Sequence, residues 1–565
     1  MISRKKVLAV FALSTLGLAS FRVASDNERY FEIAKNLDIF ATLFKEVNTY
    51  YVDEITPGKL VKTGIDGMLK SLDPYTNYIP EDDIEDFRTL TTGQYGGIGA
   101  VIVKRNSKTV VQSAYEGYPA QKAGLLPGDE LLTVNGVSLD KKTNVDINKL
   151  LRGQAQSVVK LIVTRYGQDK PVEIDITRDR IQVDNVPYYG MLTNDIGYFQ
   201  LGGFTMDAGR EVRNAVVKLK EKGAKKLVFD IRDNPGGLLN EAVNISNLFV
   251  DKGLDVVSTK GKVTEWNKTY KALDVPLDTQ IPIAIITSNR SASASEIVSG
   301  VLQDYDRAVL VGERTFGKGL VQATRPLSYN SQLKVTTAKY YIPSGRCIQE
   351  IDYSHRGEDG SLTKFPDSLR MAFKTQAGRI VYDGGGVAPD IDIQDREIAD
   401  ITRVLIQKNY LFDYATRYRS EHATIAPARE FHLTDADYQK FVTFLQGKNI
   451  NYSTDAEKSL ADLTKKVKED KHYEDVKLEL STIQRKVALN KTNDLLRFKP
   501  EIRDLLESEI ASRYYYEKGR TEASFDDDPN IQAAIAVLNE PNRYAALLKP
   551  GGQAASAKKG AGVPK

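Results

Sequence analysis

The sequence predicts a multidomain α/β protein, in which a layered α/β core follows a segment of short strands and lies between two helical regions. Three observations lead to this prediction. The chain has 565 residues, which is too long for a single hydrophobic core and suggests three or four domains. The apolar periodicity changes along the chain from helical to strand-like, then to buried strands alternating with helices, and back to helical. Apolar content of 41% and charged content of 27% are ordinary for a globular protein.

The N-terminal residues 1–25 are expected to be an export signal or an N-terminal anchor. Arg4, Lys5 and Lys6 precede a mostly apolar run over 7–19, and Arg22 closes that run. The run is short for a comfortable membrane span. We therefore expect an exported protein, periplasmic or in the cell envelope, with membrane association through this segment as an open alternative.

Charge and cysteine content exclude several classes of function. The formal net charge of +3 becomes −1 without the four basic residues of the signal, so nucleic acid is not an expected partner. Cys347 is the only cysteine, which excludes an internal disulfide framework and a four-cysteine metal site. We expect no metal and no other cofactor.

Residues 27–94 form a predicted helical segment, because apolar residues recur at helical spacing until Asp73-Pro74. Residues 95–180 read instead as short strands separated by turns such as Asn135-Gly136. This second segment resembles a PDZ domain, with Gly97-Ile98-Gly99-Ala100 matching the carboxylate-binding loop and residues 123–136 matching the longer signature. Glycines let backbone N–H groups converge on a carboxylate, and a peptide can add as a strand at the sheet edge.

Buried strands and helices alternate over residues 181–395, which predicts the layered α/β core. Examples are the strands over 227–231 and 283–286, and the helices over 211–219 and 296–302. A charged helical region is predicted over 400–548. Small and basic residues make a disordered tail the expectation for 549–565.

A serine-rich turn and a lysine between glycines suggest nucleophilic chemistry in this core. The turn is Ser291-Ala292-Ser293-Ala294-Ser295-Glu296, and Lys318 follows in Thr315-Phe316-Gly317-Lys318-Gly319. All four histidines come later in the chain, so a serine nucleophile must find another base, and a lysine that is buried enough to lose its proton can serve.

Local chemistry leaves the choice among Ser291, Ser293 and Ser295 open. Ser293-x-x-Glu296 is a helix capping box, and a helix N-terminus also favours a developing oxyanion. Lys318 and Gln322 have the same parity, so in an extended strand they share a face and Gln322 could orient the amine. The predicted strand over 227–231 runs into a Pro-Gly-Gly turn at residues 235–237. The backbone N–H groups of such a turn suit an oxyanion hole.

Together these segments resemble the carboxyl-terminal processing peptidases, tail-specific serine proteases that carry a PDZ domain. The resemblance covers roughly residues 30–395 and rests on five strings: 233–237, 291–296, 311–319, 343–346 and 386–390. It implies a core of the ClpP/crotonase-like type with an inserted PDZ domain. It further implies Ser293 as nucleophile, Lys318 as general base, and Gln322 as its orienting partner. The implied oxyanion donors are Gly236 and Ala294, and Asp304 takes the position of a supporting aspartate.

The implied partners are proteins or peptides with free apolar C-termini, and an adaptor or activator protein and homo-oligomerisation stay open. Two other enzyme classes fit poorly. Gly312 to Gly319 resembles a phosphate-binding loop but lacks the Ser or Thr that would hold magnesium. The Ser-x-x-Lys, Ser-Asp-Asn and Lys-Thr-Gly strings of penicillin-binding enzymes occur in the wrong order. A catalytically silent PDZ scaffold remains the non-enzymatic alternative.

Overall fold

The computed structural model describes residues 28–105, 107–356, 361–364, 366–394, 397–491 and 493–551. The predicted signal or anchor at 1–25 lies outside the described residues, as does the predicted tail from 552 onward. No helix within the described ranges is long and apolar enough to cross a membrane. The chain divides into two compact units, residues 1–78 and 79–565, which are described separately.

The first unit is helical, as the sequence predicts. A helix runs over residues 28–50 and α2 spans Pro57–Lys70, with Pro57 in the first helical position. After α2 the Asp73 carboxylate accepts the backbone N–H groups of Tyr75 and Thr76, each at 2.8 Å. This side-chain turn fixes the chain direction at Asp73-Pro74.

The second unit begins with η1 (Glu81–Asp83) and α3 (Ile84–Thr92) and continues into an inserted strand-rich domain. The chain enters it through β2 (Gln94–Gly97) and leaves through β9 (Asp179–Gln182), and these two strands pair antiparallel. Its sheet has the order β3-β4-β5-β7-β8, and β6 pairs with β5. The elements are β3 (Ala100–Arg105), β4 (Lys108–Ala114), α4 (Pro119–Lys122), β5 (Glu130–Val134), β6 (Val137–Ser138), α5 (Asn144–Leu151), β7 (Val158–Thr164) and β8 (Val172–Thr177).

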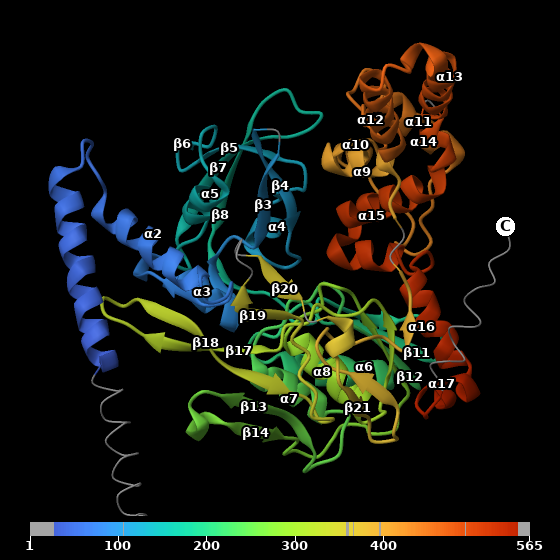
Figure 1. The fold of residues 1–565 in the computed structure, drawn as a ribbon. Coiled ribbons are helices and arrows are strands. Elements are labelled where there is room, and N and C mark those ends of the chain that lie inside the picture. The colour runs from blue at the N-terminus through green and yellow to red at the C-terminus, as the bar shows by residue number, and fades with distance from the viewer. Residues whose placement is uncertain are drawn as a thin grey trace, which may run out of the picture. The chain divides into compact units, whose positions relative to one another are not determined.

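The peptidase-like core is a six-stranded sheet of order β10-β11-β12-β15-β16-β23 (Figure 1). The strands from β11 to β23 are parallel, and β10 joins the edge antiparallel to β11. The sheet strands are β10 (Tyr188–Met191), β11 (Ile196–Gln200), β12 (Lys226–Asp230), β15 (Ile283–Thr287), β16 (Val309–Gly312) and β23 (Ile391–Asp392). A second sheet contains β13 (Asp255–Gly261), β14 (Lys268–Lys271), β17 (Leu320–Pro326) and β18 (Gln332–Tyr341).

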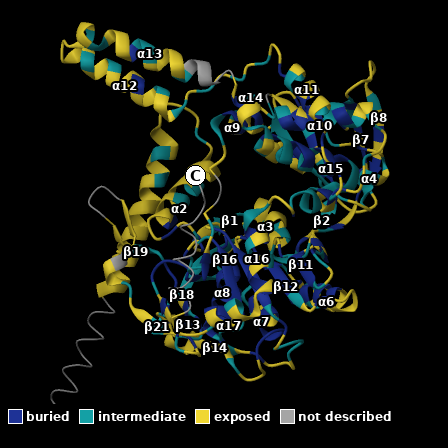
Figure 2. Ribbon diagram, turned by 90° about the vertical axis from the view of Figure 1, so that its right-hand side faces the viewer, coloured by how far each residue is buried: buried dark blue, intermediate teal, exposed yellow. Residues whose placement is uncertain are grey.

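Helices cover both faces of the core sheet, which makes three layers. Side chains alternate across a strand, so Phe199 and Phe229 pack with α6 (Ala208–Glu221), α7 (Leu239–Asn247) and α8 (Ala294–Asp304). Tyr198 and Val228 face the other side and pack with α16 (Pro529–Asn539) and α17 (Pro541–Leu547). The C-terminal helical region therefore completes the core rather than standing apart from it. Figure 2 shows the sheet and α8 buried.

Three small elements extend the core. They are the two-stranded sheets β19 (Ile351–Arg356) with β20 (Leu362–Lys364) and β21 (Ala372–Lys374) with β22 (Ile380–Tyr382), and the turn η2 (Thr264–Trp266). The remaining C-terminal helices are α9 (Asp400–Gln407), α10 (Tyr410–Glu421), α11 (Asp435–Phe444), α12 (Asp455–Glu469), α13 (Tyr473–Lys491), α14 (Asp494–Arg497) and α15 (Lys499–Ala523).

The C-terminal helical region also contacts the inserted domain. α15 is interrupted at Tyr516, whose φ of 57° and ψ of −153° are not helical. At this interruption Gln121 of α4 donates to the Tyr516 hydroxyl at 2.9 Å, and Lys518 pairs with Glu116 at 3.0 Å. Helix α10 adds a further contact, because the Arg105 guanidinium of β3 lies over the Phe412 ring at 4.0 Å. Helices α12 and α13 are mostly exposed (Figure 2).

Candidate active site

Ser293 lies in the loop between β15 and α8, directly before the first residue of α8. Its backbone has φ 57° and ψ −112°, a conformation that costs energy for any residue with a Cβ. Such strain persists only where surrounding contacts over-determine it, and it clusters at functional sites. The half-buried Ser293 therefore sits in a conformation that its neighbours must hold.

The neighbour that holds it is Glu296. One oxygen, Oε2, accepts both the Ser293 N–H and the Lys318 N–H, each at 2.8 Å. The other oxygen, Oε1, accepts the Thr315 hydroxyl at 2.6 Å and the Gly317 N–H at 2.7 Å. A single carboxylate thus joins the backbone of Ser293 to that of Lys318, although 25 positions separate them in the chain.

Glu296 is fully buried, and desolvation raises its pKa from 4.5 to about 7 against the opposing effect of its four hydrogen bonds. Only the ionised carboxylate can accept four hydrogen bonds without giving up an acceptor site to its own proton. We call this link from Glu296 to the Ser293 and Lys318 segments the clamp. It is therefore sensitive to protonation of Glu296 near neutral pH.

The structure separates the three serines of the turn. The Ser291 hydroxyl donates to the Ile231 carbonyl at 2.9 Å, and the Ser295 hydroxyl donates to the Asn234 carbonyl at 2.9 Å. Both side chains are fully buried, whereas Ser293 is half-buried. Ser291 and Ser295 therefore fasten the end of β12 and the turn after it to α8.

Lys318 lies in a loop and not in a strand, because β17 begins only at Leu320. The N–H groups of Gly317 and Lys318 bond to Glu296 and that of Gly319 bonds to the Gln349 side chain, so these three N–H groups do not pair with a neighbouring strand. Lys318 is half-buried. The expectation that Lys318 and Gln322 share one face of a strand is therefore wrong.

Gln322 and Tyr340 lie on the paired strands β17 and β18 next to this loop. The Gln322 amide donates to the Thr336 hydroxyl at 3.2 Å. The Tyr340 hydroxyl donates to the Ser293 carbonyl at 3.1 Å, and its backbone N–H donates to the Gly319 carbonyl at 2.9 Å. Tyr340 is thus a second link between the serine turn and the lysine loop, and no local sequence pattern indicates it.

The Gly236 turn lies against the start of α8. Gly236 has φ 93°, and a Cβ there would lie 2.8 Å from the Ala294 nitrogen and 2.9 Å from the Ser293 Cβ. Only glycine fits both the conformation and the space. The Gly236 N–H donates to Asn234 Oδ1 at 2.9 Å, while the Asn234 carbonyl accepts the Ala292 N–H at 3.0 Å. The structure therefore brings Gly236 and Ala294 together beside Ser293.

Asp304 lies at the opposite end of α8 from Ser293. It pairs with Arg346 at 2.9 Å and accepts the Ser344 N–H at 2.9 Å, and both charged side chains are almost completely buried. These contacts fasten the 343–346 turn to the helix.

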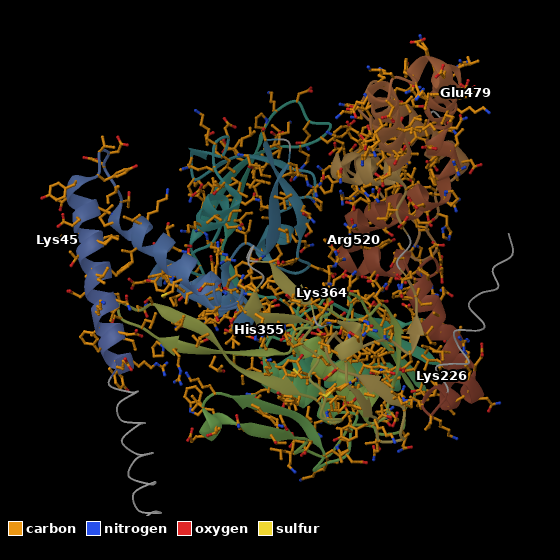
Figure 3. All side chains as sticks on the ribbon, viewed as in Figure 1. Lys45, Lys226, His355, Lys364, Glu479 and Arg520 are labelled. Carbon is orange, nitrogen blue, oxygen red and sulfur yellow. The ribbon has the colours of Figure 1, made fainter. Side chains whose placement is uncertain are left out.

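All four histidines lie in the described part of the chain, and none of their rings is hydrogen-bonded there to Ser293, Lys318 or Glu296. His355 projects from the β19–β20 sheet and pairs with Asp352 at 2.7 Å (Figure 3). The other ring contacts are made with groups of the helical region: the Tyr418 carbonyl, Glu507 and Asp475.

The predicted carboxylate-binding loop is ordered by its carbonyl groups. The Ile98 and Gly99 carbonyls accept the N–H groups of Ala120 and Tyr115, both at 2.8 Å. Gly99 has φ 75°, and a Cβ there would lie 2.5 Å from the Tyr118 Cβ. The loop leads into β3, which lies at the edge of its sheet, and α5 packs beside that strand.

Three profiles of known families match the chain. Peptidase family S41 matches residues 195–354, "PDZ domain" matches 110–165, and "Probable PDZ-protease, C-terminal helical domain" matches 401–538. The fold and these matches define the class as a serine endopeptidase that carries a PDZ domain.

Curated relatives agree with that class. The "Carboxy-terminal-processing protease" of Bartonella bacilliformis is 37% identical over 349 residues, which are 61% of this chain and 79% of the relative. The chain belongs to peptidase family S41, among the carboxy-terminal-processing proteases, and is thus not a silent scaffold. The "Probable CtpA-like serine protease" of Staphylococcus aureus is 39% identical over 55% of this chain and 62% of its own length. A solved structure, "Photosystem II D1 C-terminal processing protease", is 26% identical over 63% of this chain and 92% of its own, with a TM-score of 0.34.

Proposed function

We propose that the protein is an exported endopeptidase with a Ser293–Lys318 catalytic pair, which selects substrates by their C-terminal tail through the PDZ domain. The observation that carries the pair is the shared oxygen of Glu296, which accepts the backbone N–H groups of both residues. The strained backbone of Ser293 supports its role, since such strain is stored at functional sites.

In the proposed mechanism the neutral Lys318 amine takes the proton from the Ser293 hydroxyl as its oxygen attacks the substrate carbonyl. The resulting oxyanion accepts hydrogen bonds from the Ala294 N–H at the α8 N-terminus and from the Gly236 N–H. To do this, the Gly236 N–H gives up its hydrogen bond to Asn234 Oδ1. The Lys318 ammonium then gives its proton to the leaving amine. Water, deprotonated by the same amine, hydrolyses the acyl-enzyme. Gln322 orients the amine from β17.

Recognition of the tail is assigned to Gly97-Ile98-Gly99-Ala100, whose N–H groups would hold a terminal carboxylate while the last side chain enters an apolar pocket. Cleavage follows at small or apolar residues farther upstream. A peptide with a free C-terminus should be cleaved much faster than the same peptide with an amidated one. Equal rates would remove the PDZ domain from recognition.

The PDZ domain is also proposed to gate the core. It is attached through the paired strands β2 and β9 and contacts the helical region at Gln121 and Glu116. Tail binding would favour a domain position that permits the catalytic pair to form. Removing residues 95–180 should leave either an unregulated or a misassembled enzyme, and normal tail dependence after the deletion would contradict gating.

Export to the periplasm or cell envelope is proposed from the basic and apolar residues at the N-terminus. Fractionation of cells with an antibody against the chain would test it. An anchored protein would stay with membranes after a salt wash, and a processed one would be released with the soluble envelope fraction. Light scattering on the purified chain would show whether it forms homo-oligomers.

The catalytic pair is tested by substitution. Ser293→Ala and Lys318→Arg should both be inactive, because the first lacks a nucleophile and guanidinium cannot give up its proton at working pH. Ser291→Ala and Ser295→Ala should keep measurable turnover. A folded variant without His355, His422, His432 and His472 should keep the chemistry, and its complete inactivity would overturn the Ser–Lys assignment.

A further inference from the structure

A charged cluster at the end of β12 connects the C-terminal helical region to the proposed oxyanion turn. The Arg232 side chain folds back on Asp230, with Nη2 at 2.6 Å and Nε at 3.0 Å from Oδ2. Its remaining nitrogen, Nη1, donates to Oδ2 of Asp528 at 2.6 Å. Asp230 is 1% exposed, so its charge depends on Arg232, and Arg232 in turn is shared with the helical region.

This cluster stands at the start of the segment that becomes the oxyanion turn. Asp230 ends β12, and Gly236 follows six positions later. Between them, Asn234 donates to the Leu201 carbonyl at 2.7 Å and accepts the Gly236 N–H. The position of the turn beside Ser293 therefore depends on contacts fixed at both ends of a short segment.

The helical region also packs over the Asp230 end of the cluster, while Arg232 and Asp528 stay partly exposed. Phe525 is 1% exposed and packs its ring on those of Tyr188 and Tyr198, at centroid distances of 5.5 and 5.0 Å. The Tyr198 hydroxyl donates to Asp230 at 2.8 Å. Burial of Asp230 strengthens its contacts with Arg232.

We propose that Asp528 is a positioning residue for the peptidase reaction: it holds Arg232, and through Arg232 it fixes the segment that carries the oxyanion turn. This inference rests on the proposed oxyanion role of Gly236. It gives the C-terminal helical region an indirect part in transition-state stabilisation, because an oxyanion donor works only when it is fixed in place before the reaction.

Asp528 can be altered without disturbing its own helix. It caps α16, where its Oδ1 accepts the N–H groups of Asn530 at 2.9 Å and Ile531 at 3.1 Å, and Pro529 starts the helix. Asparagine and serine cap helices about as well as aspartate. Asp528→Asn and Asp528→Ser therefore keep a cap while removing the charge that faces Arg232.

The matched control is Asp526→Asn. Asp526 lies two positions away in the chain and pairs with Arg429 at 2.9 Å. The Asp526 side chain is more than half exposed. The Asp526→Asn variant loses one carboxylate from the same segment and leaves the contacts of Arg232 unchanged. The measurements are kcat and KM on one peptide, and the inhibition constant of a peptide boronic acid, which bonds to the serine oxygen and places a hydroxyl in the oxyanion position.

We expect both Asp528 variants of the full chain to lose about tenfold in kcat and about tenfold in boronic acid affinity, with KM unchanged, less than the loss of a direct donor. Asp526→Asn should stay within about twofold of the parent. Unchanged kcat and boronic acid affinity in folded Asp528 variants would overturn the inference. If Ser293→Ala is inactive in the same assay, only this inference has failed; if it is active, the proposed function has failed as well.

Discussion

The two ends of α8 hold buried carboxylates in opposite ways. At the N-terminal end Glu296 is surrounded by neutral donors, namely three backbone N–H groups and the Thr315 hydroxyl. At the C-terminal end Asp304 faces the Arg346 guanidinium, which is itself only 1% exposed. All eleven residues of the helix are buried, so burial alone does not distinguish its ends.

The difference lies in what each carboxylate connects. Glu296 joins two backbone segments that carry the proposed nucleophile and base, and it does so through neutral donor groups. Asp304 joins the helix to the 343–346 turn through an ion pair. Burial raises the pKa of Glu296 to about 7, so its charge can respond to pH. Burial also raises the pKa of Asp304, but the Arg346 guanidinium opposes that shift, so this carboxylate serves mainly to fasten the turn. The four predictions below are ordered by their expected effect on turnover.

Glu296→Gln should have the largest effect on turnover. The amide keeps one acceptor oxygen and places an NH₂ group against donors, so the Ser293 and Lys318 backbones lose their common partner. We expect kcat to fall about 100-fold, because small misplacement of reacting groups has costs of this size. Turnover on a peptide, measured beside a thermal melt to confirm folding, tests this. Parent-like kcat in a folded Glu296→Gln protein would show that the clamp is dispensable.

Turnover and unfolding free energy should change with pH in opposite directions. The pKa of Glu296 is raised by burial from 4.5 to about 7, so the folded state holds this proton more tightly than the unfolded state. Its contribution to stability is therefore complete below pH 4.5 and is lost as the pH rises through about 7. Turnover should change in the other direction, because the ionised carboxylate holds both segments.

The measurement compares the parent with Glu296→Gln between pH 5 and 8. The parent should lose unfolding free energy relative to the variant as the pH rises, and its turnover should rise through about pH 7. The variant retains any pH dependence that groups other than Glu296 contribute. Identical pH profiles of stability in the two proteins would show that Glu296 does not titrate in this range.

Tyr340→Phe should have a smaller effect. Its hydroxyl supports the same serine turn through the Ser293 carbonyl, but Glu296 would still hold the Ser293 and Lys318 backbones. We expect a loss of about 1 kcal/mol in unfolding free energy and about a threefold loss in kcat. Denaturant unfolding and steady-state kinetics measure the two quantities. A loss in kcat as large as that of Glu296→Gln would make Tyr340 an equal part of the clamp.

Much of the fold follows from periodicity and turn chemistry. The buried strands around Leu227 and Ile283 and the helix after Ser293 are present as predicted, because runs of buried apolar residues in a parallel sheet leave little choice of structure. The packing of α16 and α17 on the second face of the core sheet could not be predicted, because such contacts depend on which side chains meet across the chain.

The candidate active site could be predicted only in part from local sequence patterns. A capping box identified Glu296 as the partner of the Ser293 N–H, and the structure contains that bond. Its bonds to Thr315, Gly317 and Lys318 join distant positions, and no local pattern reports them. They also explain why the spacing of Lys318 and Gln322 does not place both residues in one strand. The Lys318 backbone N–H bonds to a side chain instead of to a neighbouring strand. The catalytic assignments of Ser293, Lys318, Gln322, Gly236 and Ala294 stay predictions.

Asp304→Asn should have the smallest effect on turnover and thereby complete the contrast between the ends of α8. Removing the charge leaves the buried Arg346 guanidinium without its paired carboxylate, and breaking such a pair costs about 3 kcal/mol. The loss should appear in the unfolding free energy, measured with urea, whereas kcat per folded molecule should stay within about twofold of the parent, because the helix end beside Ser293 keeps its contacts. A stable Asp304→Asn protein with strongly reduced kcat would instead give Asp304 the supporting catalytic part that the family resemblance implies.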